Sequence, residues 1–140
     1  MKRKRIVAVY GTLKTGYGNH YYLNDSEVRY LGEAVSESRF ALGHYGFPAV
    51  SPDERGGNIL VELYAVPERV LRNLDRLEGY PQFYDRKIFW FKSKLGRIPA
   101  MLYFFHDYRN ATGFTWELPE RGIFSWTRNG WIPVNLPALA

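Results

Sequence analysis

Cysteine is absent from this 140-residue sequence. Its absence excludes thiol nucleophiles, thiolate zinc sites, iron–sulfur clusters and disulfide frameworks. Long apolar runs are also lacking. The apolar run that follows the basic start covers only residues 6–10 before Gly11, which is too short for a signal peptide or a membrane-spanning helix. We therefore expect a cytoplasmic protein with no membrane partner.

Positive charge is in excess, but only at one end of the chain. The formal net charge is +5, from 19 Lys and Arg against 14 Asp and Glu. Four of these basic residues occupy positions 2–5, so 15 basic and 14 acidic residues remain over positions 6–140. We interpret residues 1–5 as a solvated basic tail and expect no nucleic-acid partner. In the alternative, this tail and the 4 Trp, 11 Tyr and 9 Phe residues would bind nucleic acid with a steep salt dependence.

The length and the hydrophobic content of 46% predict a single domain, residues 1–140, with its own core. A chain of this size buries roughly two-thirds of the surface that it exposes when unfolded, so it folds without a disulfide or a structural metal. No internal repeat or linker-like stretch divides it. Nothing in the sequence marks an oligomer interface.

Short β-rich and alternating segments predict strands at residues 6–10, 28–36, 38–45, 58–66, 84–92 and 97–105. Between them we expect a glycine-rich loop at residues 11–18, a helical turn at 19–23 and a break at 46–48. Residues 106–140 carry three of the four Trp and are interrupted by Pro and Gly. We predict an irregular segment there, clamped over a sheet by these Trp. The fold class is α+β, with a largely antiparallel sheet and few helices.

One helix is predicted at residues 67–78. Pro67 suits its first position, and Gly79 suits the left-handed position that ends a helix. The apolar positions form one stripe: Val70, Leu71, Leu74 and Leu77. Because each residue of a helix is rotated by about 100° from the one before it, Glu78 falls inside that stripe. The polar positions off the stripe are interpreted as a solvated face: Arg72, Asp75 and Arg76.

Glu78 is the candidate catalytic residue. Carboxylates are seldom buried without a partner or a function. Partial burial and a position at the helix C-terminus both raise a carboxyl pKa, toward the range that a general acid or base needs near neutral pH. In the alternatives, Glu78 pairs with an arginine such as Arg86 or frays at the helix end.

The loop after the first strand is the candidate binding element. Gly11 permits a turn in which successive N–H groups form an anion-binding nest, with a plain turn as the alternative. The nucleotide-binding P-loop spacing fails, because Gly16 is followed by Tyr17 in place of lysine. The three histidines lack the short spacing of a metal site: His20, His44 and His106. We therefore expect a small carboxylate ligand, with no metal and no cofactor.

Two motifs carry a resemblance to a known family. The first is Tyr10-Gly11-Thr12-Leu13 with Asn19-His20 after it, and the second covers residues 74–81, Leu-Asp-Arg-Leu-Glu-Gly-Tyr-Pro, with Tyr84 and Arg86 beyond. Phe47-Pro48-Ala49-Val50 and Glu62-Leu63-Tyr64 fit between them. Over residues 6–105 the sequence resembles the gamma-glutamylcyclotransferase-like family, which includes the AIG2-like and gamma-glutamylamine cyclotransferase proteins.

The resemblance implies a small mixed β-barrel and an enzyme that needs no cofactor. In the implied reaction, the α-amine of a gamma-glutamyl group attacks its own γ-carbonyl, which forms 5-oxoproline and releases an amine. Glu78 would be the acid/base, Asn19 would fix the loop, and Tyr84 would line the pocket. The glutamyl group would be held by four loop residues: Tyr10, Gly11, Thr12 and Leu13.

The sequence departs from the family pattern in two places. Val61 stands where the family often has glycine, and Asn129-Gly130-Trp131 matches its usual ending only loosely. The identity of the leaving amine therefore stays open. A function of another class is also open, namely a non-catalytic module that binds a small carboxylate or amine in the same pocket.

Overall fold

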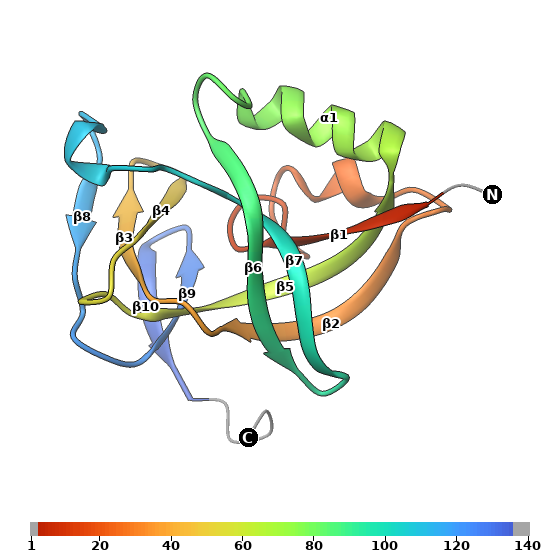
Figure 1. Cartoon of the computed structure of the whole chain (residues 1–140). Helices are drawn as coiled ribbons and strands as arrows, with labels where there is room; N and C mark the ends of the chain where they lie inside the picture. The colour runs from red at the N-terminus through yellow and green to blue at the C-terminus, as the bar shows by residue number, and fades with distance from the viewer. Residues whose placement is uncertain (1–2, 136–140) are drawn as a thin grey trace.

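The computed structural model describes residues 3–135, and its centre is a closed barrel of five strands (Figure 1). These strands are β1 (Lys4–Val9), β2 (Arg29–Ser36), β5 (Asn58–Pro67), β6 (Asp85–Ser93) and β7 (Gly96–Phe104). They follow the order β1-β7-β6-β2-β5, and β1 pairs with β5 to close the barrel. Among the pairings of these five strands, the β1–β7 pair is parallel and the others are antiparallel. The prediction of a mixed, largely antiparallel barrel is confirmed.

Further strands extend one end of the barrel (Figure 1). A small sheet has the order β4-β3-β8, made of β4 (Pro48–Pro52), β3 (Phe40–His44) and β8 (Thr115–Glu117). A hairpin of β9 (Ile123–Thr127) and β10 (Gly130–Val134) joins the barrel through a parallel pairing of β9 with β5. The remaining elements are α1 (Glu68–Glu78) and the 3-10 turns η1 (His20–Leu23) and η2 (Tyr108–Asn110).

The second half of strand β1, residues 7–9, is buried on both faces, as the apolar run in the sequence predicts. Ala8 faces the barrel interior, where it packs in a core that includes Leu63 and Leu102. Val7 and Val9 face outward into a second core, which α1 covers with the side chains of Val70, Leu71 and Leu74. Fully burying each such side chain contributes about 1.5–3 kcal/mol. This packing holds the end of β1 beside the end of α1.

Helix α1 begins and ends close to the predicted residues. Pro67 is extended, with φ −72° and ψ 161°, and immediately precedes the first helical residue. Gly79 has φ +64°, and its N–H donates to the carbonyl groups of Asp75 and Arg76. A side chain in this left-handed conformation would be strained, so glycine suits the stop. The helix therefore ends at Glu78.

The prediction of an irregular segment at residues 106–140 is wrong over much of its described part. Strands β8, β9 and β10 lie there, and residues 136–140 are outside the described range. Pro and Gly interrupt this segment, but β10, which contains Pro133, is the edge strand of its sheet, where a missing N–H breaks no ladder hydrogen bond. The break predicted at residues 46–48 lies one residue earlier, at 45–47, and strand β4, which the sequence did not predict, begins at Pro48.

The basic tail is also shorter than predicted. Residues 1–2 lie outside the described range, while Lys4 and Arg5 are already part of β1. Arg5 reaches toward Glu68 on α1, with an Nη1–Oε2 distance of 3.7 Å. Lys4 and Arg5 pair with Pro67 and Val66 of β5, as part of the antiparallel pairing that closes the barrel. This pairing explains why they belong to the strand. In the described part of the chain, no helix is long and apolar enough to cross a membrane.

Candidate active site

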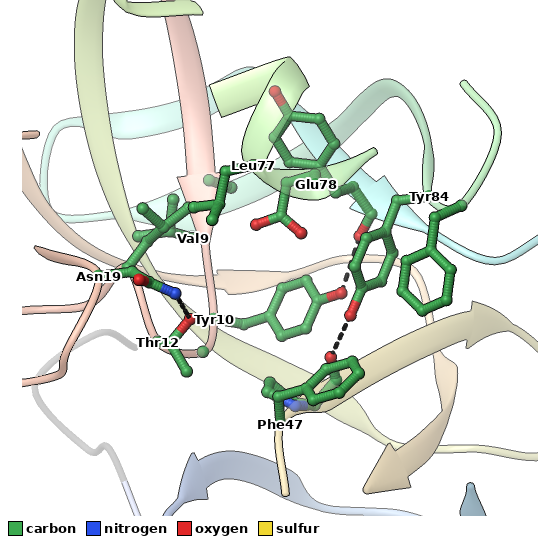
Figure 2. A pocket seen from close by; sticks show the side chains of 14 residues that line it. Val9, Tyr10, Thr12, Asn19, Phe47, Leu77, Glu78 and Tyr84 are labelled. Carbon is green, nitrogen blue, oxygen red and sulfur yellow. Dashed lines mark hydrogen bonds between the residues drawn. The ribbon is translucent and has the colours of Figure 1, made fainter. Parts of the chain in front are cut away.

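One pocket lies between the end of β1, the glycine-rich loop and the C-terminal end of α1 (Figure 2). Its volume is about 290 Å³. Its lining includes every residue that the sequence predicted for the site: Tyr10, Gly11, Thr12, Leu13, Asn19, Glu78 and Tyr84. The fold thus brings together two motifs that are far apart in the sequence, although the roles of their residues stay predictions.

Gly11 is required for its small size. A Cβ atom at this position would lie 2.4 Å from Cγ of Pro48, so any larger residue would push the loop away from β4. The φ angle of Gly11 is not among the positive ones, so the backbone freedom expected from the sequence is not the reason for glycine here. Because the loop and β4 touch at this point, Gly11 and Pro48 together form one end of the pocket.

Three adjacent backbone amides of the loop have no acceptor. In the part of the chain that the structure describes, the N–H groups of Gly11, Thr12 and Leu13 donate no hydrogen bond. The loop is held instead by Asn19, whose Nδ2 donates to Thr12 Oγ1 at 2.8 Å and whose N–H donates to the Thr12 carbonyl at 2.9 Å. Neighbouring free amides form a favourable site for an anionic or carbonyl oxygen.

The carboxylate of Glu78 points into the pocket (Figure 2). The residue is partly buried, and its side chain makes no hydrogen bond or ion pair with any residue that the structure describes. Burial raises the pKa of Glu78 from 4.5 to about 7. A carboxyl group with this pKa is populated in both its protonated and its ionised form near neutral pH.

Two phenols stand across the pocket from Glu78, and both donate elsewhere (Figure 2). The hydroxyl of Tyr84 donates to the Pro48 carbonyl at 2.6 Å, and that of Tyr10 donates to the Tyr103 carbonyl at 2.9 Å. Burial, together with the charge of Glu78, raises the pKa of both phenols. Among the residues that line the pocket, Glu78 is therefore the one that titrates near neutrality.

Arg86 does not pair with Glu78. Its Nε lies 2.9 Å from Oδ1 of Asp75, and the hydroxyl of Tyr103 donates to the same oxygen at 2.7 Å. The Asp75 side chain is 19% exposed, so its assignment to a solvated face was wrong. Arg86 also packs over the ring of Tyr80, 4.4 Å from its centroid. Arg86 thus pairs with Asp75, and the Glu78 carboxylate has no partner within residues 3–135.

A comparison with known families agrees with this geometry. The model of the family described as gamma-glutamyl cyclotransferase, AIG2-like, matches residues 7–122. The match contains both motifs and Glu78. The chain belongs to the AIG2-like gamma-glutamyl cyclotransferase family.

Individual members of the AIG2-like family agree with the match. A protein of Drosophila melanogaster, named as a predicted gamma-glutamylcyclotransferase, is 43% identical over 89 residues, which cover 58% of this chain and 56% of the fly protein. A gamma-glutamylaminecyclotransferase of Bos taurus is 38% identical over 87 residues, covering 57% and 52%. The chain thus spans about half the length of each. A crystal structure of a Mus musculus AIG2-like protein has a TM-score of 0.66 at 27% identity, covering 74% of this chain and 78% of that one.

Seven further residues of this AIG2-like pocket were not predicted as site residues: Ala8, Val9, Phe47, Pro48, Leu77, Phe83 and Tyr103. Most are apolar, and their side chains exclude water from Glu78. This desolvation is the physical cause of its raised pKa. Phe47 and Pro48 stood in a segment that matched the family pattern, so that match was a usable signal. No local sequence pattern marked Tyr103 as a site residue, because β7 comes close to the end of α1 only when the barrel is formed.

The three histidines of this family member make separate contacts. A ring nitrogen of His20 lies 2.9 Å from the Leu13 carbonyl, and the Nε1–H of Trp126 donates to His44 at 3.0 Å. His106 pairs with Asp85. Over residues 3–135, no three His, Asp or Glu side chains are grouped as metal ligands would be.

Proposed function

We propose that this protein is a gamma-glutamyl cyclotransferase in which Glu78 is the general acid/base. The observation that carries the proposal is a carboxylate with a pKa of about 7 and no partner among residues 3–135, in a pocket that is also lined by Gly11, Thr12 and Leu13, whose backbone amides donate to none of these residues. The reaction converts a gamma-glutamyl amine into 5-oxoproline and a free amine. Membership of the family and the names of the fly and bovine relatives support this activity.

The loop would bind and fold the glutamyl group. A carboxylate or carbonyl oxygen of the substrate would accept hydrogen bonds from the amides of Gly11, Thr12 and Leu13. The α-amine would then lie close to the γ-carbonyl carbon of the same glutamyl group. Holding two reacting groups of one molecule in this way is worth an effective concentration on the order of 10⁵–10⁸ M. Orientation is therefore a major part of the proposed catalysis.

Glu78 would move the proton that the reaction must transfer. As a carboxylate, it takes a proton from the substrate α-ammonium, which then has the lone pair for attack on the γ-carbonyl carbon. The new C–N bond closes a five-membered lactam, and the C–N bond to the leaving amine breaks. Glu78 returns its proton to that amine. The attacking nitrogen brought two hydrogens and the lactam nitrogen keeps only one, so Glu78 passes the second proton to the leaving amine in the same way. The amine therefore departs as an ammonium ion, the carboxylate is regenerated and no water is consumed. General acid–base help of this kind typically contributes about 10²–10⁴-fold.

The decisive variant is Glu78→Gln, which keeps the shape of the side chain but cannot carry the proton. We expect 5-oxoproline release from the best substrate to fall by about 10²–10⁴-fold. The substrates to compare are gamma-glutamyl dipeptides, gamma-glutamyl-ε-lysine and glutathione. Glu68→Gln is the matched control, because Glu68 lies on the same helix with 55% of its side chain exposed. Equal rates for the Glu78→Gln variant and the parent would contradict the role of Glu78.

The pH profile gives a second readout of the same proposal. The base form of Glu78 predominates above its pKa of about 7, so kcat/KM should rise with pH up to that value. This rise, the acidic limb of the pH profile, should be missing from the kcat/KM of the Glu78→Gln variant. If no substrate yields 5-oxoproline while one of them binds saturably, the non-catalytic binding module is the correct function.

A further inference from the structure

The β9–β10 hairpin contacts the loop that lines the pocket. Its first residue, Ile123, comes directly after the family match, which ends at residue 122. Inside the matched region the loop is anchored by Asn19 on Thr12, by His20 at the Leu13 carbonyl, and by Glu62 of β5, whose Oε1 accepts the Thr15 N–H at 2.8 Å. The hairpin supplies a further anchor, at Lys14.

Lys14 is a buried lysine whose partners belong to β9. Its side-chain ammonium donates to the Trp126 carbonyl at 2.8 Å and to Ser125 Oγ at 3.1 Å. The residue is only 7% exposed, and it forms no ion pair within 4 Å with any described residue. Burial lowers the pKa of Lys14, an effect that the charges of Glu62 and Glu33 oppose. A buried ammonium that lost these acceptors would be strongly destabilised, so they hold the loop in place.

Aromatic contacts join the same two segments. The ring of Tyr17, at the far end of the loop, lies 5.4 Å from that of Trp126. Arg128, in the turn of the hairpin, lies over the Tyr17 ring at 5.2 Å and donates to the Gly16 carbonyl at 3.4 Å. At the near end, Trp131 of β10 stacks on Tyr10 at 5.9 Å. The hairpin therefore contacts the loop at both ends as well as at Lys14.

We propose that Lys14 is a positioning residue, through which the β9–β10 hairpin holds residues 10–17 in the conformation that binds the glutamyl group. This inference rests on the proposed function for its catalytic consequence, whereas its structural part does not depend on activity. Lys14 does not line the pocket, so it acts through the amides of Gly11, Thr12 and Leu13. The hairpin becomes part of the binding machinery even though it lies outside the family match.

Hydrogen exchange tests the structural part without any substrate. Over residues 14–20, five backbone amides donate hydrogen bonds to described residues: those of Lys14, Thr15, Tyr17, Asn19 and His20. In Lys14→Met, which keeps the length but not the charge, we expect exchange over residues 14–20 to quicken roughly tenfold, with α1 unchanged. Lys94→Met, at an exposed position in the β6–β7 turn, is the matched control and should leave the loop unchanged. Unchanged exchange in Lys14→Met would overturn the proposal, as would equal acceleration throughout the chain.

Kinetics test the catalytic part. Lys14→Met should lower kcat/KM by roughly tenfold to a hundredfold, mostly through a higher KM, because it misplaces the amides that hold the substrate. The acidic limb of the pH profile should stay near pH 7, since Glu78 is untouched. A loss in kcat alone, or a shifted limb, would contradict a positioning role.

Ser125→Ala provides a milder variant of the same contact. It removes one of the two acceptors of Lys14 and leaves the Trp126 carbonyl in place, so a smaller change in the same direction is expected. If Lys14→Met fails to fold, this variant decides the proposal by the same readouts. If the parent itself releases no 5-oxoproline, the proposed function fails, while the exchange data still decide whether Lys14 positions the loop.

Discussion

Two carboxylates near the end of α1, only three residues apart, have opposite surroundings. Asp75 faces β6 and β7, where Arg86 and Tyr103 contact the same carboxylate oxygen. Glu78 faces the pocket, where no described residue bonds to its carboxylate and burial raises its pKa to about 7. Both lie in the last turn of the helix, where the macrodipole disfavours negative charge. The difference between them therefore comes from their partners and not from the helix.

The contrast separates a structural carboxylate from a reactive one. Pairing with Arg86 fixes Asp75, and through it the end of α1, against the barrel. Glu78 is partly buried without compensation, which destabilises its charged form and prepares it to accept a proton. Arg86, the arginine that the sequence offered as a partner of Glu78, is held by Asp75 instead. Substitutions at the two positions should consequently change stability in opposite directions.

The largest effect is expected for Asp75→Asn. It removes the charge from a pair whose side chains are each 19% exposed, leaving a largely buried guanidinium without a counter-charge. Breaking one partner of a buried pair typically costs 3–5 kcal/mol, and partial exposure places this case near about 3 kcal/mol. Urea unfolding at pH 7 measures the loss.

The control for this variant is Asp107→Asn, at the exposed pair that Asp107 forms with Arg109. Exposed pairs contribute only about 0–1 kcal/mol, so this variant should unfold near the parent. Losses of equal size in the two variants would show that the Asp75 pair is no stronger than a surface pair.

The second effect has the opposite sign. Glu78→Gln should stabilise the protein at pH 8 by about 2 kcal/mol, since a raised pKa makes the ionised carboxylate unfavourable in the folded state. At pH 4 the carboxyl is protonated in both folded and unfolded chains, so the gain should vanish. It should grow as the pH rises from about 4.5, the value in an unfolded chain, to about 7. Unfolding the two proteins at pH 4 and pH 8 checks this, and a gain independent of pH would exclude titration of Glu78 as its cause.

The sequence predicted Glu78 but not its neighbour. Glu78 falls inside a single apolar stripe, which periodicity detects without knowledge of the fold, and Gly79 signals the helix end. Asp75 lies off that stripe, and its partners reach it from other strands. Arg86 is 11 residues away and Tyr103 is 28 residues away. Because periodicity describes one face of one helix, it carries no information about a long side chain that arrives from a strand.

The same limit explains why the sequence did not predict the C-terminal β9–β10 hairpin. Asn129-Gly130 is a turn signal that sequence reasoning could have used, and Gly130 does adopt φ +107°. Pro133 lies in β10, and only the finished sheet shows that β10 is an edge strand, where proline is tolerated. The barrel strands were easier to predict, since their alternating or continuous apolar residues report burial locally. Contacts between Lys14 and β9 follow from the assembled fold alone.

The smallest effect should come from Tyr103→Phe, which removes one of the two partners of Asp75. The ring still packs, the carbonyl of residue 103 still accepts from Tyr10, and Asp75 keeps Arg86. We therefore expect a loss of about 1 kcal/mol, the usual net value of one hydrogen bond.

Urea unfolding of double variants that contain Tyr103→Phe tests how independent the two carboxylates are. When Tyr103→Phe is combined with Asp75→Asn, the two losses of stability should be non-additive, because both changes act on the contacts among Asp75, Arg86 and Tyr103. Combined with Glu78→Gln, the coupling should be smaller than with Asp75→Asn, because Tyr103 shares the pocket with Glu78 but donates its hydrogen bond to Asp75. Strong coupling in the second pair would show that the charge of Glu78 depends on the Asp75 network directly, and the division between a structural and a reactive carboxylate would then be wrong.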